Sequence, residues 1–93
     1  MTRLSGQELA NALHDLSGWS AAGDEIRKTY QFENFVRAVA FVNRVADAAE
    51  AANHHPDIDI RYNKVTIALT THDEGGISDK DVALARRLDG FEA

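Results

Sequence analysis

The alternation of apolar and polar residues predicts two β-hairpins separated by a long helix. Residues 19–22 and 26–32 form two strand-like runs around Gly23-Asp24, and in the second run Ile26, Tyr30 and Phe32 alternate with polar residues. Residues 58–69 form another pair of alternating runs, with a break at Asn63-Lys64 that is typical of a tight turn. We expect one face of each hairpin to pack on helices.

The segment from Asn34 to about Asn53 has a helical period instead. Its apolar residues are spaced by threes and fours, which predicts that one face of a long helix is buried. The helix must end before Pro56, because the residue preceding a proline is pushed out of the α region. The residues expected on the buried face are Phe35, Val39, Val42, Ala46 and Ala49.

Two capping boxes predict the starts of two further helices. Ser5 and Glu8 cap a first helix that should end near Gly18, and Ser78 and Asp81 cap the last helix. The element order is therefore α-β-β-α-β-β-α. It predicts an α+β fold in which a four-stranded antiparallel sheet carries three helices on one face. A chain of 93 residues is too short for a second domain, so we expect a single domain over residues 1–93.

Composition narrows the classes of function. Ten Lys and Arg residues against fifteen Asp and Glu residues give a net charge of −5 with histidine neutral, so the chain lacks the basic field that direct nucleic-acid binding requires. The absence of cysteine removes disulfides and thiol catalysis. No stretch approaches the ~20 apolar residues that span a bilayer, and the first residues lack the apolar run of a signal peptide. We therefore expect a cytoplasmic protein without membrane contact.

Candidate chemistry is concentrated in the histidines. Three of the four lie in two short segments, residues 53–57 and 70–73, which flank the second hairpin. A hairpin returns the chain to where it left, so His54, His55 and His72 are predicted to converge at its open end. Imidazole has an unperturbed pKa of about 6.5, so a histidine cluster supplies a proton donor and a proton acceptor near neutral pH. This pattern indicates acid/base chemistry on a small molecule.

Two other interpretations compete with catalysis. A His-His pair in a loop is often solvated surface, and three imidazoles are also enough to hold a catalytic zinc ion. Ligands on sequence neighbours splay apart in a loop, however, and the chain has no cysteine. Metal-free catalysis is therefore favoured, and we expect neither a metal nor another cofactor.

Four ordered motifs carry a family resemblance. The four motifs lie between residues 53 and 81, and the resemblance extends upstream of them through Phe35-x-x-Ala38-x-x-Phe41-x-x-Arg44-Val45-Ala46. Altogether it covers most of the chain from about Phe35 to Leu88. With these motifs the chain resembles the pterin-4a-carbinolamine dehydratase family, the 4a-hydroxytetrahydrobiopterin dehydratases. The motifs are Asn53-His54-His55-Pro56-Asp57, Tyr62-Asn63-Lys64-Val65, Leu69-x-Thr71-His72 and Gly76-Ile77-Ser78-x-x-Asp81.

The resemblance implies dehydration of 4a-hydroxytetrahydropterin to quinonoid dihydropterin, which recycles the pterin cofactor of aromatic amino acid hydroxylases. His54 and His72 would act on two sides of the reaction with His55 assisting, and the sequence leaves open which histidine is the acid. Asp81 would lie near the active site besides capping a helix. Glu50, one turn before the histidine pair, could orient His54 or bind a pterin amine. The further substrate contacts that the resemblance implies are Asn53, Thr70, Thr71 and Asp73.

The chain departs from some family members at two positions. Ile58 stands where they have an aromatic residue soon after His-His-Pro, and Glu74 stands where they have a cysteine after Thr-His.

An open sheet edge in the predicted fold favours pairing with a second copy, so we expect a homodimer or homotetramer. The alternative function is that of a non-catalytic dimerisation or assembly partner of another protein, which would not need three converging imidazoles.

Overall fold

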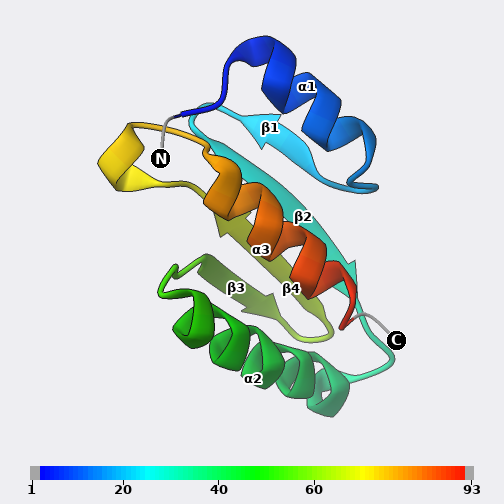
Figure 1. The fold of residues 1–93 in the computed structure, drawn as a ribbon. Helices are drawn as coiled ribbons and strands as arrows, with labels where there is room; N and C mark the ends of the chain where they lie inside the picture. The colour runs from blue at the N-terminus through cyan, green and yellow to red at the C-terminus, as the bar shows by residue number, and fades with distance from the viewer. Residues whose placement is uncertain (1–2, 92–93) are drawn as a thin grey trace.

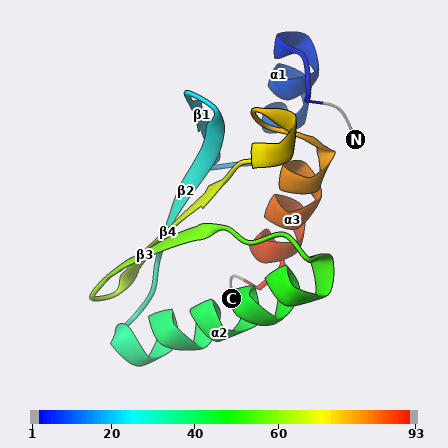
Figure 2. The same ribbon diagram turned by 90° about the vertical axis from the view of Figure 1, so that its left-hand side faces the viewer.

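The computed structural model describes residues 3–91 and confirms the predicted α+β class and element order. A four-stranded antiparallel sheet carries its helices on one face (Figures 1 and 2). Residues 1, 2, 92 and 93, which the predicted domain includes, lie outside the described residues. The elements are α1 (Gly6–His14), β1 (Ser20–Ala22), β2 (Glu25–Gln31), α2 (Phe35–Ala52), β3 (Asp57–Arg61), β4 (Lys64–Leu69), the short 3₁₀ helix η1 (His72–Glu74) and α3 (Asp79–Asp89).

The strand order determines which loops meet. The sheet runs β1-β2-β4-β3, so β2 and β4 are central, and Ile26 at the start of β2 pairs with Leu69 at the end of β4. The segment that follows β4 therefore leaves the sheet beside the β1–β2 turn. There the Thr70 hydroxyl donates a 2.5 Å hydrogen bond to the backbone oxygen of Asp24. The pairing of β2 with β4 therefore fixes the point at which the segment that contains His72 leaves the sheet.

The core lies between the sheet and the helices. The predicted alternation along β2 is confirmed, because Ile26 and Tyr30 are fully buried while Arg27 and Gln31 are exposed. Val65, Ile67 and Leu69 of β4 continue the same buried face. Trp19 and Tyr30 are both core residues.

The predicted buried face of α2 is wrong in part. Ala49 is buried, but Phe35 is 50% exposed and Ala46 is also exposed. Several helical stripes of this alanine-rich segment are apolar, and packing selects the one that carries Phe41, whose ring centroid lies 4.6 Å from that of Tyr30. The residues of α2 that are buried are Ala38, Phe41, Val45, Ala48 and Ala49.

Two boundaries also differ from the prediction. The second hairpin turns at Tyr62-Asn63 instead of Asn63-Lys64, since Arg61 pairs with Lys64 and Tyr62 has a φ of 54°. The Asn63 side chain donates to the Phe32 backbone oxygen at 2.8 Å, which stabilises this turn. Helix α1 ends at His14, four residues before Gly18, which has a φ of 86°.

Both predicted capping boxes are present. Ser5 and Glu8 exchange hydrogen bonds at the start of α1, and Ser78 and Asp81 form the corresponding box at α3. The backbone N–H of Ser5, and then its hydroxyl, hold the pKa of Glu8 below its ordinary value. Among residues 3–91, no helix has the length and apolar character needed to cross a membrane.

Asp89, at the end of α3, ties the last helix to the first hairpin. Its Oδ1 accepts hydrogen bonds from the Tyr30 hydroxyl at 2.6 Å, the Lys28 ammonium at 3.0 Å and the Trp19 indole N–H at 3.1 Å. Tyr30 is fully buried, so its hydroxyl depends on partners within the protein. This carboxylate therefore fixes the C-terminal half of α3 against the sheet.

We predict that Asp89→Ala lowers the free energy of unfolding by about 2–3 kcal/mol, because it removes a charged acceptor shared by three donors. Urea denaturation measures the effect. The control is Asp47→Ala on α2, whose exposed carboxylate should contribute less than about 1 kcal/mol. Equal effects of the two substitutions would contradict the anchoring role.

Candidate active site

The end of α2 determines the position of His54. The helix ends at Ala52, and Asn53 adopts the left-handed conformation with φ 50° and ψ 44°. The backbone N–H groups of Asn53 and His54 then donate to the carbonyl oxygens of Glu50 and Ala49, at 3.2 and 3.0 Å. Asparagine is among the few residues that tolerate this conformation at a helix end. Asn53, implied as a substrate contact, therefore has a conformational role that turns His54 out of the helix.

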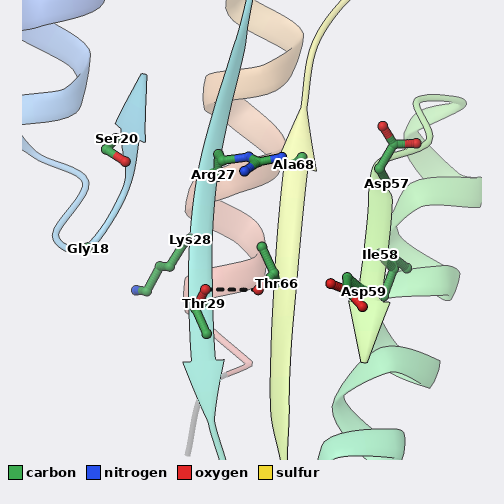
Figure 3. Close-up of a pocket in the computed structure, with 10 residues that line it drawn as sticks. All are labelled: Gly18, Ser20, Arg27, Lys28, Thr29, Asp57, Ile58, Asp59, Thr66 and Ala68. Atoms are coloured by element: carbon green, nitrogen blue, oxygen red, sulfur yellow. Dashed lines mark hydrogen bonds between the residues drawn. The ribbon is translucent and has the colours of Figure 1, made fainter. Parts of the chain in front are cut away.

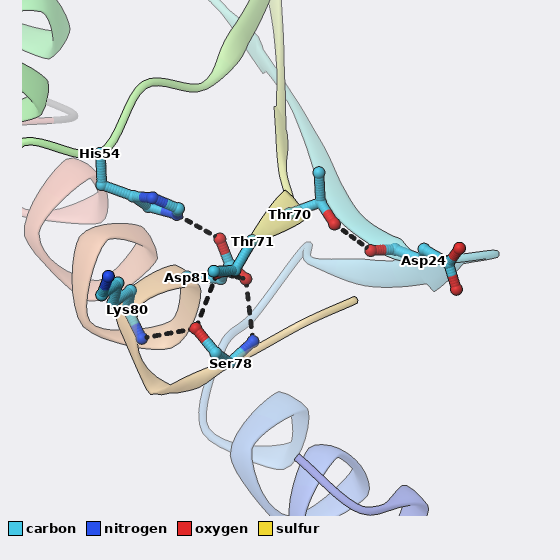
Figure 4. Close-up of polar contacts among 7 residues, drawn as sticks. All are labelled: Asp24, His54, Thr70, Thr71, Ser78, Lys80 and Asp81. Atoms are coloured by element: carbon cyan, nitrogen blue, oxygen red, sulfur yellow. Dashed lines mark hydrogen bonds and ion pairs between the residues drawn. The ribbon is translucent and has the colours of Figure 1, made fainter. Parts of the chain in front are cut away.

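Asp81 is the buried centre of the site (Figure 4). Its side chain is completely buried, and its Oδ2 accepts hydrogen bonds from the Thr71 hydroxyl and the Ser78 backbone N–H, both at 2.9 Å. Its Oδ1 lies 2.5 Å from Nε2 of His54. An ionised carboxylate only accepts hydrogen bonds, so Nε2 would be the donor in this contact, and the neutral tautomer with its proton on Nε2 would present Nδ1 as an acceptor. The two histidine segments are thus joined through one carboxylate.

The hydroxyl groups predicted to contact substrate are bonded inside the protein. Besides its bond to Asp81, the Thr71 hydroxyl lies 2.7 Å from the Ser78 hydroxyl, and Thr70 donates to the Asp24 backbone. The sequence assigned Ser78 only a capping role. The box it forms with Asp81 was the available signal, but the contact with Thr71 depends on the fold.

His55 and Glu50 form a separate, exposed pair. The His55 Nε2 is hydrogen-bonded to a Glu50 carboxylate oxygen, and both side chains are more than half exposed, at 59% and 75%. Glu50 therefore contacts His55 instead of orienting His54. Solvent screens this pair, so its contribution to stability is small.

His72 lies in η1, directly after Thr71, whose hydroxyl is bonded to Asp81. It lines a hollow of about 230 Å³ together with Thr70, Asp24 and Glu25, whereas His54 lines a different hollow of about 420 Å³ between α2 and α3. Asp73 is exposed in the same short helix. No hydrogen bond joins the three histidines within the described chain, and no group of three or more histidines and carboxylates there is arranged to hold a metal ion. The predicted convergence is thus indirect, through Asp81 and Thr71.

A larger hollow lies elsewhere, on the open face of the sheet (Figure 3). It measures about 610 Å³, and its polar lining includes Arg27, Asp57 and Asp59 but no histidine. Thr29 and Thr66 share a 2.8 Å hydrogen bond at its centre. Because it lacks an acid/base pair near neutral pH, we assign the candidate chemistry to the histidine segments.

Comparisons with known proteins indicate one family over nearly the whole chain. The family model described as pterin 4 alpha carbinolamine dehydratase matches residues 2–91. A Roseiflexus sp. (strain RS-1) protein is 58% identical over 88 residues, which cover 95% of each chain, and a Nocardia farcinica protein is 54% identical over 86 residues, covering 92% and 90%. Both relatives bear provisional names as pterin-4-alpha-carbinolamine dehydratases.

Two solved structures are similar to this fold. A Brucella melitensis protein described as a transcriptional coactivator/pterin dehydratase has a TM-score of 0.96 and 32% identity, covering 99% of this chain and 100% of that one. A pterin dehydratase-like protein described as a RuBisCO assembly factor of the alpha-carboxysome has a TM-score of 0.66 and 22% identity, covering 81% of this chain and 87% of its own. The second likeness shows a shared fold alone.

We predict that Asp81→Ala lowers the free energy of unfolding by about 2–4 kcal/mol, because it leaves the buried Thr71 hydroxyl and Ser78 N–H without their acceptor. The matched control is Asp79→Ala, two residues earlier on the same helix and exposed, which should lose at most about 1 kcal/mol of helix-dipole stabilisation. Urea denaturation followed by circular dichroism distinguishes them. Similar losses in the two variants would contradict the central position of Asp81.

Proposed function

The chain belongs to the pterin 4 alpha carbinolamine dehydratase family, and we therefore propose that it dehydrates 4a-hydroxytetrahydropterin to quinonoid dihydropterin. This reaction would recycle the pterin cofactor of aromatic amino acid hydroxylases. The observation that supports it best is Asp81, which bonds His54 on one side and Thr71, the neighbour of His72, on the other. One acid/base group of the proposed reaction is thus bonded directly to this buried carboxylate, and the segment that carries the other is bonded to it through Thr71.

The elimination needs two proton transfers. The C4a hydroxyl takes a proton and leaves as water when the C4a–O bond breaks, and N5 gives up its proton so that its electron pair completes a C4a=N5 double bond. One acid and one base that flank a flat heterocycle satisfy this requirement near neutral pH without a redox change. In this proposal His54 and His72 supply the pair, and His55 assists.

The remaining site residues divide into positioning groups and substrate contacts. Asp81 orients the His54 imidazole and stabilises the imidazolium when that ring takes a proton, as the carboxylate of a catalytic triad does. Thr71 holds Asp81, and Asn53 turns the chain toward it. The exposed carboxylates of Glu50 and Asp73 are suited to the amino-pyrimidinone edge of the pterin, which is rich in hydrogen-bond donors. The Thr70 hydroxyl is bonded to Asp24, so Thr70 would offer its backbone.

Self-association is proposed to occur through β3. This edge strand is exposed along its whole length, and Ile58 and Ile60 are 38% and 39% exposed. Antiparallel pairing of two copies about Ile60 places Ile60 against Ile60 and Asp59 against Arg61. An apolar side chain then faces its own copy, and opposite charges face each other. A cytoplasmic location for the resulting homodimer or homotetramer stays a prediction.

We predict that His54→Ala and His72→Ala each lower turnover of 4a-hydroxytetrahydropterin by a factor of about 10² to 10⁴, the usual contribution of a positioned acid or base. Stopped-flow decay of the substrate above its spontaneous rate provides the measurement. His14→Ala is the matched control, because His14 lies at the end of α1 outside the proposed site. Unchanged turnover in both His54 and His72 variants, with folding intact, would contradict the mechanism.

We also predict that Ile60→Lys dissociates the oligomer, because it sets two like charges against each other at the centre of the paired edge. Sedimentation velocity at micromolar concentration should show a dimer or tetramer for the wild type and a smaller species for the variant. Ala10→Lys, on the exposed side of α1, is expected to sediment like the wild type. A monomeric wild type would refute this pairing.

A further inference from the structure

A groove between the end of α2 and the outer face of α3 lies against His54. This α2–α3 groove has a volume of about 420 Å³ and an apolar floor of Ala52, Ala83 and Leu84. Lys80 and Arg87 also line it. An apolar hollow with a few polar groups is typical of small-molecule sites. The hollow that contains His72 differs, because it is lined by Asp24, Glu25 and glycines.

The charge of the groove is opposite to that of the whole protein. Lys80 and Arg87 are seven residues apart, about two helical turns, and so project from the same face of α3. Asp79 is the single carboxylate in the lining, which leaves a local excess of positive charge in a chain of net charge −5. No ion pair joins either cation to a carboxylate within residues 3–91. Figure 4 shows Lys80 on the side of α3 where His54 lies.

We propose that the α2–α3 groove binds the C6 substituent of the pterin, and that Lys80 and Arg87 favour a substituent that ends in a carboxylate or phosphate. The inference rests on the dehydratase function proposed above. An anion at the rim would meet two cations, while the methylene groups nearer the ring would cover the apolar floor. The lining of the groove therefore indicates a substrate class, the 4a-hydroxytetrahydropterins with an anionic C6 substituent.

The connectivity of the pterin ring links this groove to the roles of the histidines. C6 is bonded to N5, and N5 is bonded to C4a, from which the hydroxyl leaves. A base that takes the N5 proton therefore lies beside the C6 substituent. Of the three candidate histidines, His54 lines the groove, and its Nδ1 is free of the bond that Nε2 makes with Asp81. The proposal assigns His54 as the base at N5.

Two stable pterins test the groove without turnover. A 6-(2-carboxyethyl)pterin and the matching 6-(3-hydroxypropyl)pterin are fluorescent, so quenching titrations give their dissociation constants for the wild type and for a Lys80→Gln/Arg87→Gln double variant. The wild type should bind the carboxylate about 2- to 25-fold more tightly, since each of the two exposed ion pairs is worth a factor of about 1.5 to 5. The preference should shrink with added salt and disappear in the double variant.

The matched control is Arg86→Gln. Arg86 is adjacent to Arg87 and is also exposed, but it does not line the groove, so this variant removes one positive charge from α3 and should retain the preference. Equal affinity of the wild type for the two pterins would overturn the proposal, as would a preference that survives in the double variant. Ala83→Leu provides a second test, because filling the floor should weaken 6-substituted pterins more than unsubstituted pterin.

A separate assay distinguishes failure of the groove from failure of the proposed function. A 4a-hydroxytetrahydropterin without a C6 substituent has nothing to place in the groove, so its dehydration by the wild type reports on the histidines alone. A wild type that dehydrates this substrate but shows no preference for the carboxylate contradicts the groove assignment only.

Discussion

The site depends on the burial of one carboxylate. Asp81 is completely buried, and a buried charge is tolerated only when hydrogen bonds replace its lost hydration. Three groups meet that demand: His54 after α2, Thr71 after β4 and the backbone N–H of Ser78 before α3. They come from segments far apart in the sequence, so the same hydrogen bonds that satisfy the charge also hold the two histidine segments in fixed relation.

The rest of the fold supports this arrangement from two sides. The left-handed conformation of Asn53 turns His54 toward α3, and the pairing of β2 with β4 delivers Thr70 and Thr71 beside the first hairpin. Asp89 fixes the far end of α3 through Trp19, Lys28 and Tyr30. Helix α3 is therefore held at both ends, which keeps Asp81 and the α2–α3 groove in register with His54. A rigid support of this kind is what positioned acid/base catalysis requires.

Local sequence signals predicted the elements well because each has a local physical cause. The two capping boxes, the alternation along β2 and the stop before Pro56 are all set by neighbouring residues. The buried face of α2 was predicted in part wrongly, since tertiary contact between Phe41 and Tyr30 chooses among several apolar stripes. The second hairpin turns one residue earlier than predicted, because the Asn63 side chain bonds to Phe32, a contact outside the hairpin. The histidine residues and Asp81 were identified from motifs, but their connection through Thr71 and Ser78 depends on the fold, and so does the juxtaposition of Lys80 and Arg87 with His54.

The central claim is that Asp81 acts through His54, and a double-mutant cycle on kcat/KM for 4a-hydroxytetrahydropterin tests it most directly. The cycle compares His54→Ala, Asp81→Ala and the double variant at a temperature where all three are folded. If the carboxylate works by orienting this imidazole, the double variant should be no slower than His54→Ala alone, because residues that act as a unit are not additive. Losses that multiply would show that Asp81 contributes independently of His54, and would contradict the account.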